Sequence, residues 1–269
     1  MSQSKPLGTA LITGASSGIG ATYADRLAQR GYDLILVARN VERLDALAAR
    51  LKTQAGVKVR VQQADLTDKA DLKAVERILR EDASITVLVN NAGSAVPGGF
   101  SAPDLDAQEE LIQLNVTAVM RLAGAVIPAF LARGSGAIIN IASVLAYGPE
   151  LMPGVYPATK AFVAAFSQGL QSELGGRGLY VQAVLPAATR TEIWDRTGVP
   201  IDSLPAGSVM GVDDLVDAAL VGFDRRELFT LPSLADDGLF TAMNDARLAL
   251  IKNVRSDRPA ERYRVRAPA

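Results

Sequence analysis

The sequence has no cysteine and no histidine among its 269 residues. Without cysteine, the chain has no disulfide, no thiolate metal ligand and no thiol nucleophile. Without histidine, it lacks the usual general base near neutral pH and the commonest metal ligand. Any acid–base chemistry must therefore come from tyrosine, lysine or carboxylates, and we expect no metal site.

The chain also lacks a large excess of either charge, because 28 basic and 29 acidic residues leave a net charge of −1. Such a balance creates no field that attracts nucleic acid or an anionic membrane, so neither is expected as a partner. Residues 1–8 are polar and contain no signal-peptide core, and no apolar run approaches the ~20 residues of a membrane span. We therefore expect a cytoplasmic protein with an ordinary globular core.

The sequence does contain one dense glycine cluster, in the stretch Leu11–Gly20 (LITGASSGIG), which is followed by an amphipathic segment at 21–30. Glycines at a strand-to-helix turn let the backbone bend tightly and let a ligand lie against bare main chain. The first N–H groups of the helix stay free at the positive end of its dipole, an arrangement that binds a pyrophosphate. The spacing is G-x-x-x-G-x-G, which differs from the common dinucleotide fingerprint G-x-G-x-x-G.

Strand-like and helical patterns alternate along the rest of the chain. We expect strands at 33–38, 57–61, 86–89, 136–141, 179–185 and 227–231, and helices at 41–54, 68–80, 105–133 (with an adjustment at Pro128), 156–174, 213–223 and 236–253. This alternation predicts a single-domain, Rossmann-like α/β fold: a doubly wound parallel sheet of about seven strands with helices on both faces. The expected domain covers 1–269, with a mobile substrate loop at about 187–210 and a C-terminal helix and tail at 236–269.

Glycine-containing or polar motifs follow the predicted strands where each strand ends. They are Gly14–Gly20, Arg39, Asp65, Asn90–Gly93, Ser143 and Pro186–Thr191. The carboxyl ends of parallel strands lie along one edge of the sheet, which is where ligands bind in such folds. The motifs are therefore expected to meet in one site.

The combination of motifs resembles the short-chain dehydrogenase/reductase family. The residues that carry the resemblance are T-G-A-S-S-G-I-G (Thr13–Gly20), N-N-A-G (Asn90–Gly93), Asn115, Ser143 and Y-P-A-T-K (Tyr156–Lys160), in the family's order and separations. The resemblance covers roughly residues 7–231. It implies an oxidoreductase that moves a hydride between a nicotinamide cofactor and a carbonyl or secondary alcohol.

The candidate catalytic residues are Asn115, Ser143, Tyr156 and Lys160. Tyr156 and Lys160 are one helical turn apart and share a helix face. A nearby ammonium, together with the positive nicotinamide ring, predicts a lowered pKa for the phenol, which then exchanges a proton with the substrate oxygen. The resemblance implies that Lys160 also binds the nicotinamide ribose, that Ser143 holds the substrate oxygen, and that Asn115 holds a water that relays protons from Lys160.

The end of the second predicted strand bears on the choice of cofactor. NAD-selective sites usually have an acidic residue there, whereas this chain has Ala38-Arg39-Asn40. Arg39 is a planar cation suited to a 2′-phosphate, with no carboxylate in the motif to repel one, so NADP(H) is favoured and NAD(H) is the alternative. The other predicted cofactor contacts are Thr13, Gly14, Ser16, Ser17, Gly18, Ile19, Gly20, Asp65, Leu66, Asn91, Ala92, Gly93, Tyr156, Lys160, Pro186 and Thr191. Ala187 stands where the family has glycine, which puts the local backbone path in doubt.

The expected substrate pocket is mostly apolar, which favours a hydrophobic ketone or aldehyde. The predicted substrate contacts are Ser143, Leu145, Met152, Tyr156 and Trp194. A carboxylated substrate anchored by Arg190 is the alternative. Two other functions stay open: a non-catalytic NAD(P)-binding sensor or scaffold and, more weakly, an epimerase or dehydratase. A pure binder, however, has no need of Tyr156 or Ser143.

The helices expected at 105–133 and 156–174 carry apolar residues on more than one face. These residues include Leu122, Val126, Phe162, Val163 and Phe166. The resemblance implies that the corresponding helices form a dimer interface, usually within a homotetramer. We therefore expect a homo-oligomer, either a dimer or a tetramer, that acts on a small molecule.

Overall fold

The computed structural model describes residues 7–101, 103–197 and 200–264. The chain divides into two compact units, Met1–Pro232 and Ser233–Ala269. The first unit holds the sheet and its covering helices. In the second, the structure describes helix α9 (Gly238–Asn253) and the short turn η6 (Glu261–Tyr263).

One seven-stranded sheet forms the centre of the first unit, and all its neighbouring strands are parallel. The strands are β1 (Thr9–Thr13), β2 (Asp33–Ala38), β3 (Val59–Gln63), β4 (Ile85–Asn90), β5 (Gly136–Ile141), β6 (Leu179–Val184) and β7 (Phe229–Thr230). Their order, β3-β2-β1-β4-β5-β6-β7, confirms the predicted doubly wound sheet. The winding changes direction between β1 and β4, the position at which such sheets bind ligands.

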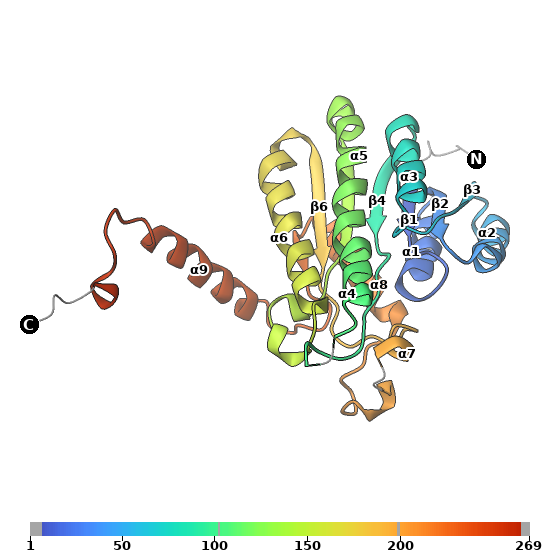
Figure 1. Cartoon of the computed structure of the whole chain (residues 1–269). Coiled ribbons are helices and arrows are strands. Elements are labelled where there is room, and N and C mark those ends of the chain that lie inside the picture. The colour runs from blue at the N-terminus through green and yellow to red at the C-terminus, as the bar shows by residue number, and fades with distance from the viewer. Residues whose placement is uncertain (1–6, 102, 198–199, 265–269) are drawn as a thin grey trace, which may run out of the picture. The chain divides into compact units, whose positions relative to one another are not determined.

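Helices cover both faces of the sheet (Figure 1). The main ones are α1 (Gly18–Gln29), α2 (Val41–Ala55) and α8 (Val212–Asp224) on one face, and α3 (Lys69–Glu81), α5 (Val119–Arg133) and α6 (Tyr156–Leu174) on the other. Each face of the sheet has its own core: the first lies against α1, α2 and α8, and the second against α3, α5 and α6. Because successive strand residues point to opposite faces, Ile12 of β1 packs in the first core and Leu11 in the second. Both faces of β1 are buried, which explains its unbroken apolar run.

Short polar side chains start several of the helices. Asn40 accepts a hydrogen bond from the backbone of Arg43 at the start of α2, and Asp68 accepts two at the start of α3. Gly56 ends α2 in the left-handed conformation that glycine adopts without strain. α1 is different, because Ser17 precedes it with no side-chain hydrogen bond to the helix.

The long helix expected at 105–133 is present but irregular at an unexpected place. α4 (Leu105–Ile112) leads into a π-helical segment, η1 (Gln113–Ala118), before α5 continues to Arg133. Pro128, the predicted point of adjustment, lies inside regular α5. The irregularity instead contains Asn115, and π-segments often mark functional sites.

By length and composition alone, the helix through Leu105–Arg133 is able to cross a membrane, with a mean hydropathy of 1.6. The expectation that no segment approaches this character is therefore wrong. In the fold, however, 44% of its most apolar window is buried. Leu122, Val126 and Phe130 pack with α3 and the sheet in the second core, so packing accounts for part of the apolar composition.

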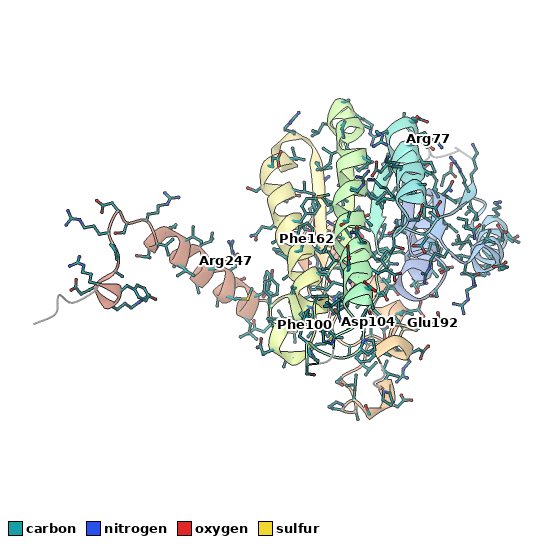
Figure 2. All side chains as sticks on the ribbon, viewed as in Figure 1. Arg77, Phe100, Asp104, Phe162, Glu192 and Arg247 are labelled. Carbon is teal, nitrogen blue, oxygen red and sulfur yellow. The ribbon has the colours of Figure 1, made fainter. Side chains whose placement is uncertain are left out.

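The apolar residues that suggested a subunit interface fall into two groups. Leu122, Val126 and Val163 are buried within the fold. Phe162 (Figure 2) and Phe166 on α6 are only partly buried. Their rings stack on each other, with centroids 5.5 Å apart and planes at 17°. The homo-oligomer stays a prediction, and of these five residues Phe162 and Phe166 are the two that are not fully buried.

Tyr23 on α1 places a polar hydroxyl group inside the first core. Its side chain is fully buried, and its hydroxyl has no hydrogen-bond partner among the described residues. Burial raises the pKa of this phenol far above its ordinary value.

We predict that Tyr23→Phe leaves the free energy of unfolding unchanged or raises it by about 1 kcal/mol, because it removes an unsatisfied buried group and keeps the ring. Leu27→Ala on the same buried face should lower that free energy by about 2–5 kcal/mol. Urea unfolding followed by circular dichroism measures both. A loss of more than about 1 kcal/mol in Tyr23→Phe would show that the hydroxyl makes a stabilising hydrogen bond.

Candidate active site

A cavity of about 1250 Å³ lies at the carboxyl ends of the strands. Residues from every motif that follows a predicted strand line it, including Gly18, Arg39, Gly93, Ser143 and Pro186. All the other predicted site residues line it too, except Thr13, Gly20 and Asn115, which are buried behind its wall. The expectation that the motifs meet in one site is met.

The glycine turn is held against the end of β4. The Asn91 side-chain amide donates to the carbonyls of Thr13 (2.9 Å) and Gly14 (3.2 Å), and the Thr13 hydroxyl accepts from the backbone N–H groups of Asn91 and Ala92 (both 3.0 Å). Thr13 and Asn91 therefore fix the two loops at the point where the sheet's winding changes direction. Thr13, predicted as a cofactor contact, holds the turn from behind.

The glycines leave room that a side chain would fill. Gly14 and Gly18 have positive φ angles of 64° and 52°. A Cβ atom added at Gly20 would overlap the Gly14 carbonyl and the Asn91 amide. This position therefore demands glycine for close packing, even though Gly20 does not line the cavity.

The start of α1 fits the pyrophosphate of a dinucleotide. No side chain caps the helix, and its first turn has no acidic residue, so its free N–H groups face no competing negative charge. Ser16, Ser17 and Gly18 line the cavity beside these groups. The residues present thus suit the cofactor that the motif implies.

Arg39 has a neighbour that the sequence reasoning missed. Its Nη1 lies 3.5 Å from Oδ2 of Asp65, which follows the adjacent strand β3. Burial alone raises the pKa of Asp65, but hydrogen bonds from Thr67 and the charge of Arg39 outweigh this effect and lower it. A carboxylate does therefore lie near the proposed 2′-phosphate position, although none occurs in the local motif.

A second cation at the cavity was not predicted. Nη1 of Arg43, in the first turn of α2, donates to both carboxylate oxygens of Glu192 at 2.9 Å. Glu192 lies just before α7 (Trp194–Thr197), in the predicted substrate loop (Figure 2). In the sequence, the signal for this second cation was that Arg43 follows Arg39 by four residues. In the described part of the chain, acidic side chains form no cluster of three or more that would hold a metal ion.

The candidate catalytic side chains converge at the far end of the cavity. Nζ of Lys160 donates to the carbonyl of Ile141 (2.8 Å) and lies 5.6 Å from the centre of the Tyr156 ring. Burial raises the pKa of Tyr156 to about 12, partly offset by a hydrogen bond with Ser143, and lowers the pKa of Lys160 to about 8. The lowered Tyr156 pKa expected from the ammonium and the nicotinamide ring together is therefore not found in the protein alone, where burial is the largest effect.

Asn115 does not reach the cavity. Its Nδ2 donates to the Ser94 carbonyl (3.0 Å) and to the Thr159 hydroxyl (3.1 Å), and its Oδ1 accepts from the Ser94 N–H (3.0 Å). Both amide hydrogens are committed to these partners. The Asn115 amide therefore has no free hydrogen to donate to a relay water.

Apolar side chains dominate the rest of the wall. Besides the predicted Leu145, Met152 and Trp194, the wall includes Ala95, Pro97, Leu114, Ile193 and Leu204. Trp194 donates its indole N–H to the Thr189 carbonyl (2.7 Å). Arg190 does not line the cavity and instead pairs with Asp202 at 2.9 Å, which removes the sequence-based case for a carboxylate anchor.

The departure from the family pattern at Ala187 has no structural cost. Among the described residues, Arg226 is the one non-glycine residue with a positive φ angle, so Ala187 adopts a backbone conformation open to any residue. Pro186 accepts hydrogen bonds from the Val144 N–H (3.0 Å) and the Ser143 hydroxyl (3.4 Å). These contacts join the loops after β5 and β6.

Comparison with known families agrees with this geometry. A family model described as short chain dehydrogenase matches residues 8–199. The chain belongs to this family. It is therefore an oxidoreductase of the short-chain dehydrogenase/reductase type.

Solved structures of two bacterial family members resemble this short-chain dehydrogenase over nearly its whole length. A short-chain dehydrogenase from Sphingobium yanoikuyae in complex with NADPH is 58% identical, with a TM-score of 0.93 over 96% of this chain and 100% of that one. A bulky-bulky ketone specific alcohol dehydrogenase from Comamonas testosteroni is 50% identical, with a TM-score of 0.89 over 96% and 99%.

A more distant relative is the very-long-chain 3-oxoacyl-CoA reductase of Anas platyrhynchos, which is 38% identical over 188 residues. The match covers 68% of this chain and 60% of the duck protein, so the chain spans less than two thirds of that relative's length.

We predict that Gly20→Ala in this short-chain dehydrogenase weakens NADPH binding at least about tenfold, because the added methyl group displaces the turn or Asn91. Gly124→Ala on α5 is the matched control, since its added methyl group meets open space; it should leave binding unchanged and stabilise the helix by up to about 1 kcal/mol. NADPH fluorescence titration and thermal unfolding measure the two effects. Wild-type affinity in Gly20→Ala would show that the turn is not rigid.

Proposed function

We propose that the protein is an NADP(H)-dependent oxidoreductase that interconverts hydrophobic ketones or aldehydes and their alcohols, with Tyr156 as the acid–base group. The observation that carries this proposal is the convergence of Ser143, Tyr156 and Lys160 on one cavity that also contains the glycine turn. A cofactor-binding protein without catalysis has no use for a hydroxyl, a phenol and an ammonium group placed together beside an apolar wall.

In the proposed reduction, the bound cofactor supplies a hydride to the carbonyl carbon. Tyr156 keeps its proton at neutral pH, because its pKa is about 12, and donates it to the carbonyl oxygen. Ser143 orients that oxygen through its hydroxyl. The phenolate left on Tyr156 is stabilised by the Lys160 ammonium, which is mostly charged below its pKa of about 8. In the alcohol-to-ketone direction the same groups move the proton the opposite way.

The substrate class rests on the wall of the cavity. Leu145, Met152 and Trp194 provide apolar surface in the cavity that Tyr156 also lines, and Arg190 lies outside the wall. The names of the Comamonas and duck relatives describe ketone chemistry with large substituents. These observations support a ketone or aldehyde with apolar substituents.

We predict that Tyr156→Phe lowers kcat for ketone reduction about 10²–10⁴-fold while NADPH still binds, because the variant loses the proton donor but keeps the ring. NADPH consumption with a panel of aryl and aliphatic ketones and aldehydes measures turnover, and nucleotide fluorescence measures binding. Turnover that persists in Tyr156→Phe would rule out this acid–base role. Tight binding with no turnover on any carbonyl in wild type would favour the sensor or scaffold alternative.

The proposed preference for NADP(H) rests on Arg39 at the rim of the cavity, and the NADPH complex of the Sphingobium relative supports it. Among the described residues, the Arg39 guanidinium is held by an exposed ion pair with Asp65, so it can turn toward a 2′-phosphate at little cost. Arg43, four residues further on, makes a closer ion pair with Glu192, at 2.9 Å, that is also about half exposed.

We predict that Arg39→Ala reduces the ratio of kcat/KM with NADPH to kcat/KM with NADH by about tenfold or more, because a charge-assisted contact with the 2′-phosphate is lost. Arg60→Ala is the matched control: Arg60 is an exposed arginine on neighbouring β3 that does not line the cavity. Initial rates with both cofactors measure the ratio. An unchanged ratio in Arg39→Ala would transfer the role to Arg43 or remove the basis for the preference.

A further inference from the structure

Thr159 lies between the two predicted catalytic residues of α6 but does not line the cavity. Its side chain is buried, and its hydroxyl donates to the Tyr156 carbonyl at 2.7 Å. The same oxygen accepts from Nδ2 of Asn115 at 3.1 Å. One hydroxyl therefore joins the π-helical segment η1 to the first turn of α6.

The chain of hydrogen bonds continues beyond Asn115. Its amide holds both the N–H and the carbonyl of Ser94, in the loop that follows the N-N-A-G motif. Thr159 thus connects the turn that carries Tyr156 to the loop after β4. Without the hydroxyl, one hydrogen of the buried Asn115 amide would have no acceptor, which penalises the present orientation of that amide.

The start of α6 depends on such outside contacts. Val155 precedes the helix with no side-chain hydrogen bond of its own to the helix. Its backbone N–H instead donates to Oε1 of Gln108, a buried residue of α4, at 3.4 Å. Among the hydrogen bonds of the described residues, the Asn115–Thr159 contact at 3.1 Å is a shorter link from 105–118 to the catalytic turn than the Gln108 contact.

We propose that Thr159 is a positioning residue, whose hydroxyl holds the catalytic turn of α6 on Asn115 and so sets the orientation of Tyr156 toward the substrate. The proposal rests on the proposed function for its kinetic consequence. A threonine in a helix often bonds back to the preceding turn for purely local reasons. The bond received from Asn115 is what distinguishes Thr159.

The test compares Thr159→Val, which keeps the shape and loses the hydroxyl, with Thr159→Ser, which keeps the hydroxyl. Ser167 provides a matched control on the same helix, because its hydroxyl also donates to a backbone carbonyl (Val163, 2.7 Å) and accepts from an asparagine amide (Asn140, 2.9 Å). Ser167 lies away from the cavity. Thr159→Val and Ser167→Ala should therefore cost similar stability.

We expect Thr159→Val to lower kcat about tenfold or more, with NADPH affinity within about threefold of wild type, because only the orientation of the turn changes. Thr159→Ser should recover most of kcat, and Ser167→Ala should leave it unchanged. In the double variant with Asn115→Ala, the losses should not multiply, since both changes break one link. Wild-type kcat in Thr159→Val, or equal losses in Ser167→Ala, would overturn the proposal.

A second measurement does not need turnover. Hydrogen–deuterium exchange of the peptide covering 155–162 should be faster in Thr159→Val than in wild type and in Thr159→Ser. If wild type reduces no carbonyl, the proposed function fails while this measurement still decides the positioning role: unchanged exchange contradicts it. If Thr159→Val does not fold, Thr159→Ala with the same two readouts replaces it.

Discussion

The site depends on the contact between two loops at the point where the sheet's winding changes direction. The side-chain amide of Asn91 reaches the carbonyls of Thr13 and Gly14. Gly20 lies so close to the Gly14 carbonyl and the Asn91 amide that no Cβ atom fits there. This contact fixes the start of α1 relative to the end of β4. One cavity is therefore faced by both the free N–H groups of the helix and the loop leading to Ser94. From the same loop, hydrogen bonds run from Ser94 through Asn115 and Thr159 to α6.

Burial then sets the chemistry at the other end of the cavity. Tyr156 and Lys160 each carry a pKa shifted toward the uncharged form, because neither charge is well solvated. A phenolate and an ammonium placed together relieve this penalty for each other, so the proton transfer that creates the phenolate is easier beside Lys160 than it would be alone. The sequence argument identified this pair but assigned too little weight to burial, which a spacing pattern does not report.

Features that depend on adjacent residues were predicted well from the sequence, whereas contacts between residues distant in the sequence were not. The sheet, the limits of β2, β5 and α6, and the motifs at the cavity follow from short patterns, because glycine turns and a one-turn separation are properties of adjacent residues. The pairing of Arg39 with Asp65 depends on the parallel register of β2 and β3, in which Ala38 faces Gln63. The π-helical turn and the role of the Asn115 amide likewise depend on Ser94 and Thr159, which are distant in sequence.

The two ends of the cavity differ in how firmly they are built. At the catalytic end, Lys160, Asn115 and Thr159 are buried and hydrogen-bonded, so a change there leaves polar groups without partners and is costly. At the rim, Arg39 and Arg43 are about half exposed and held by ion pairs that contribute little in water. Substitutions at the rim should therefore disturb the fold less than substitutions at the buried end. This contrast makes the rim the part of the site that is easier to alter, and the buried hydrogen-bonded end the part that the fold protects.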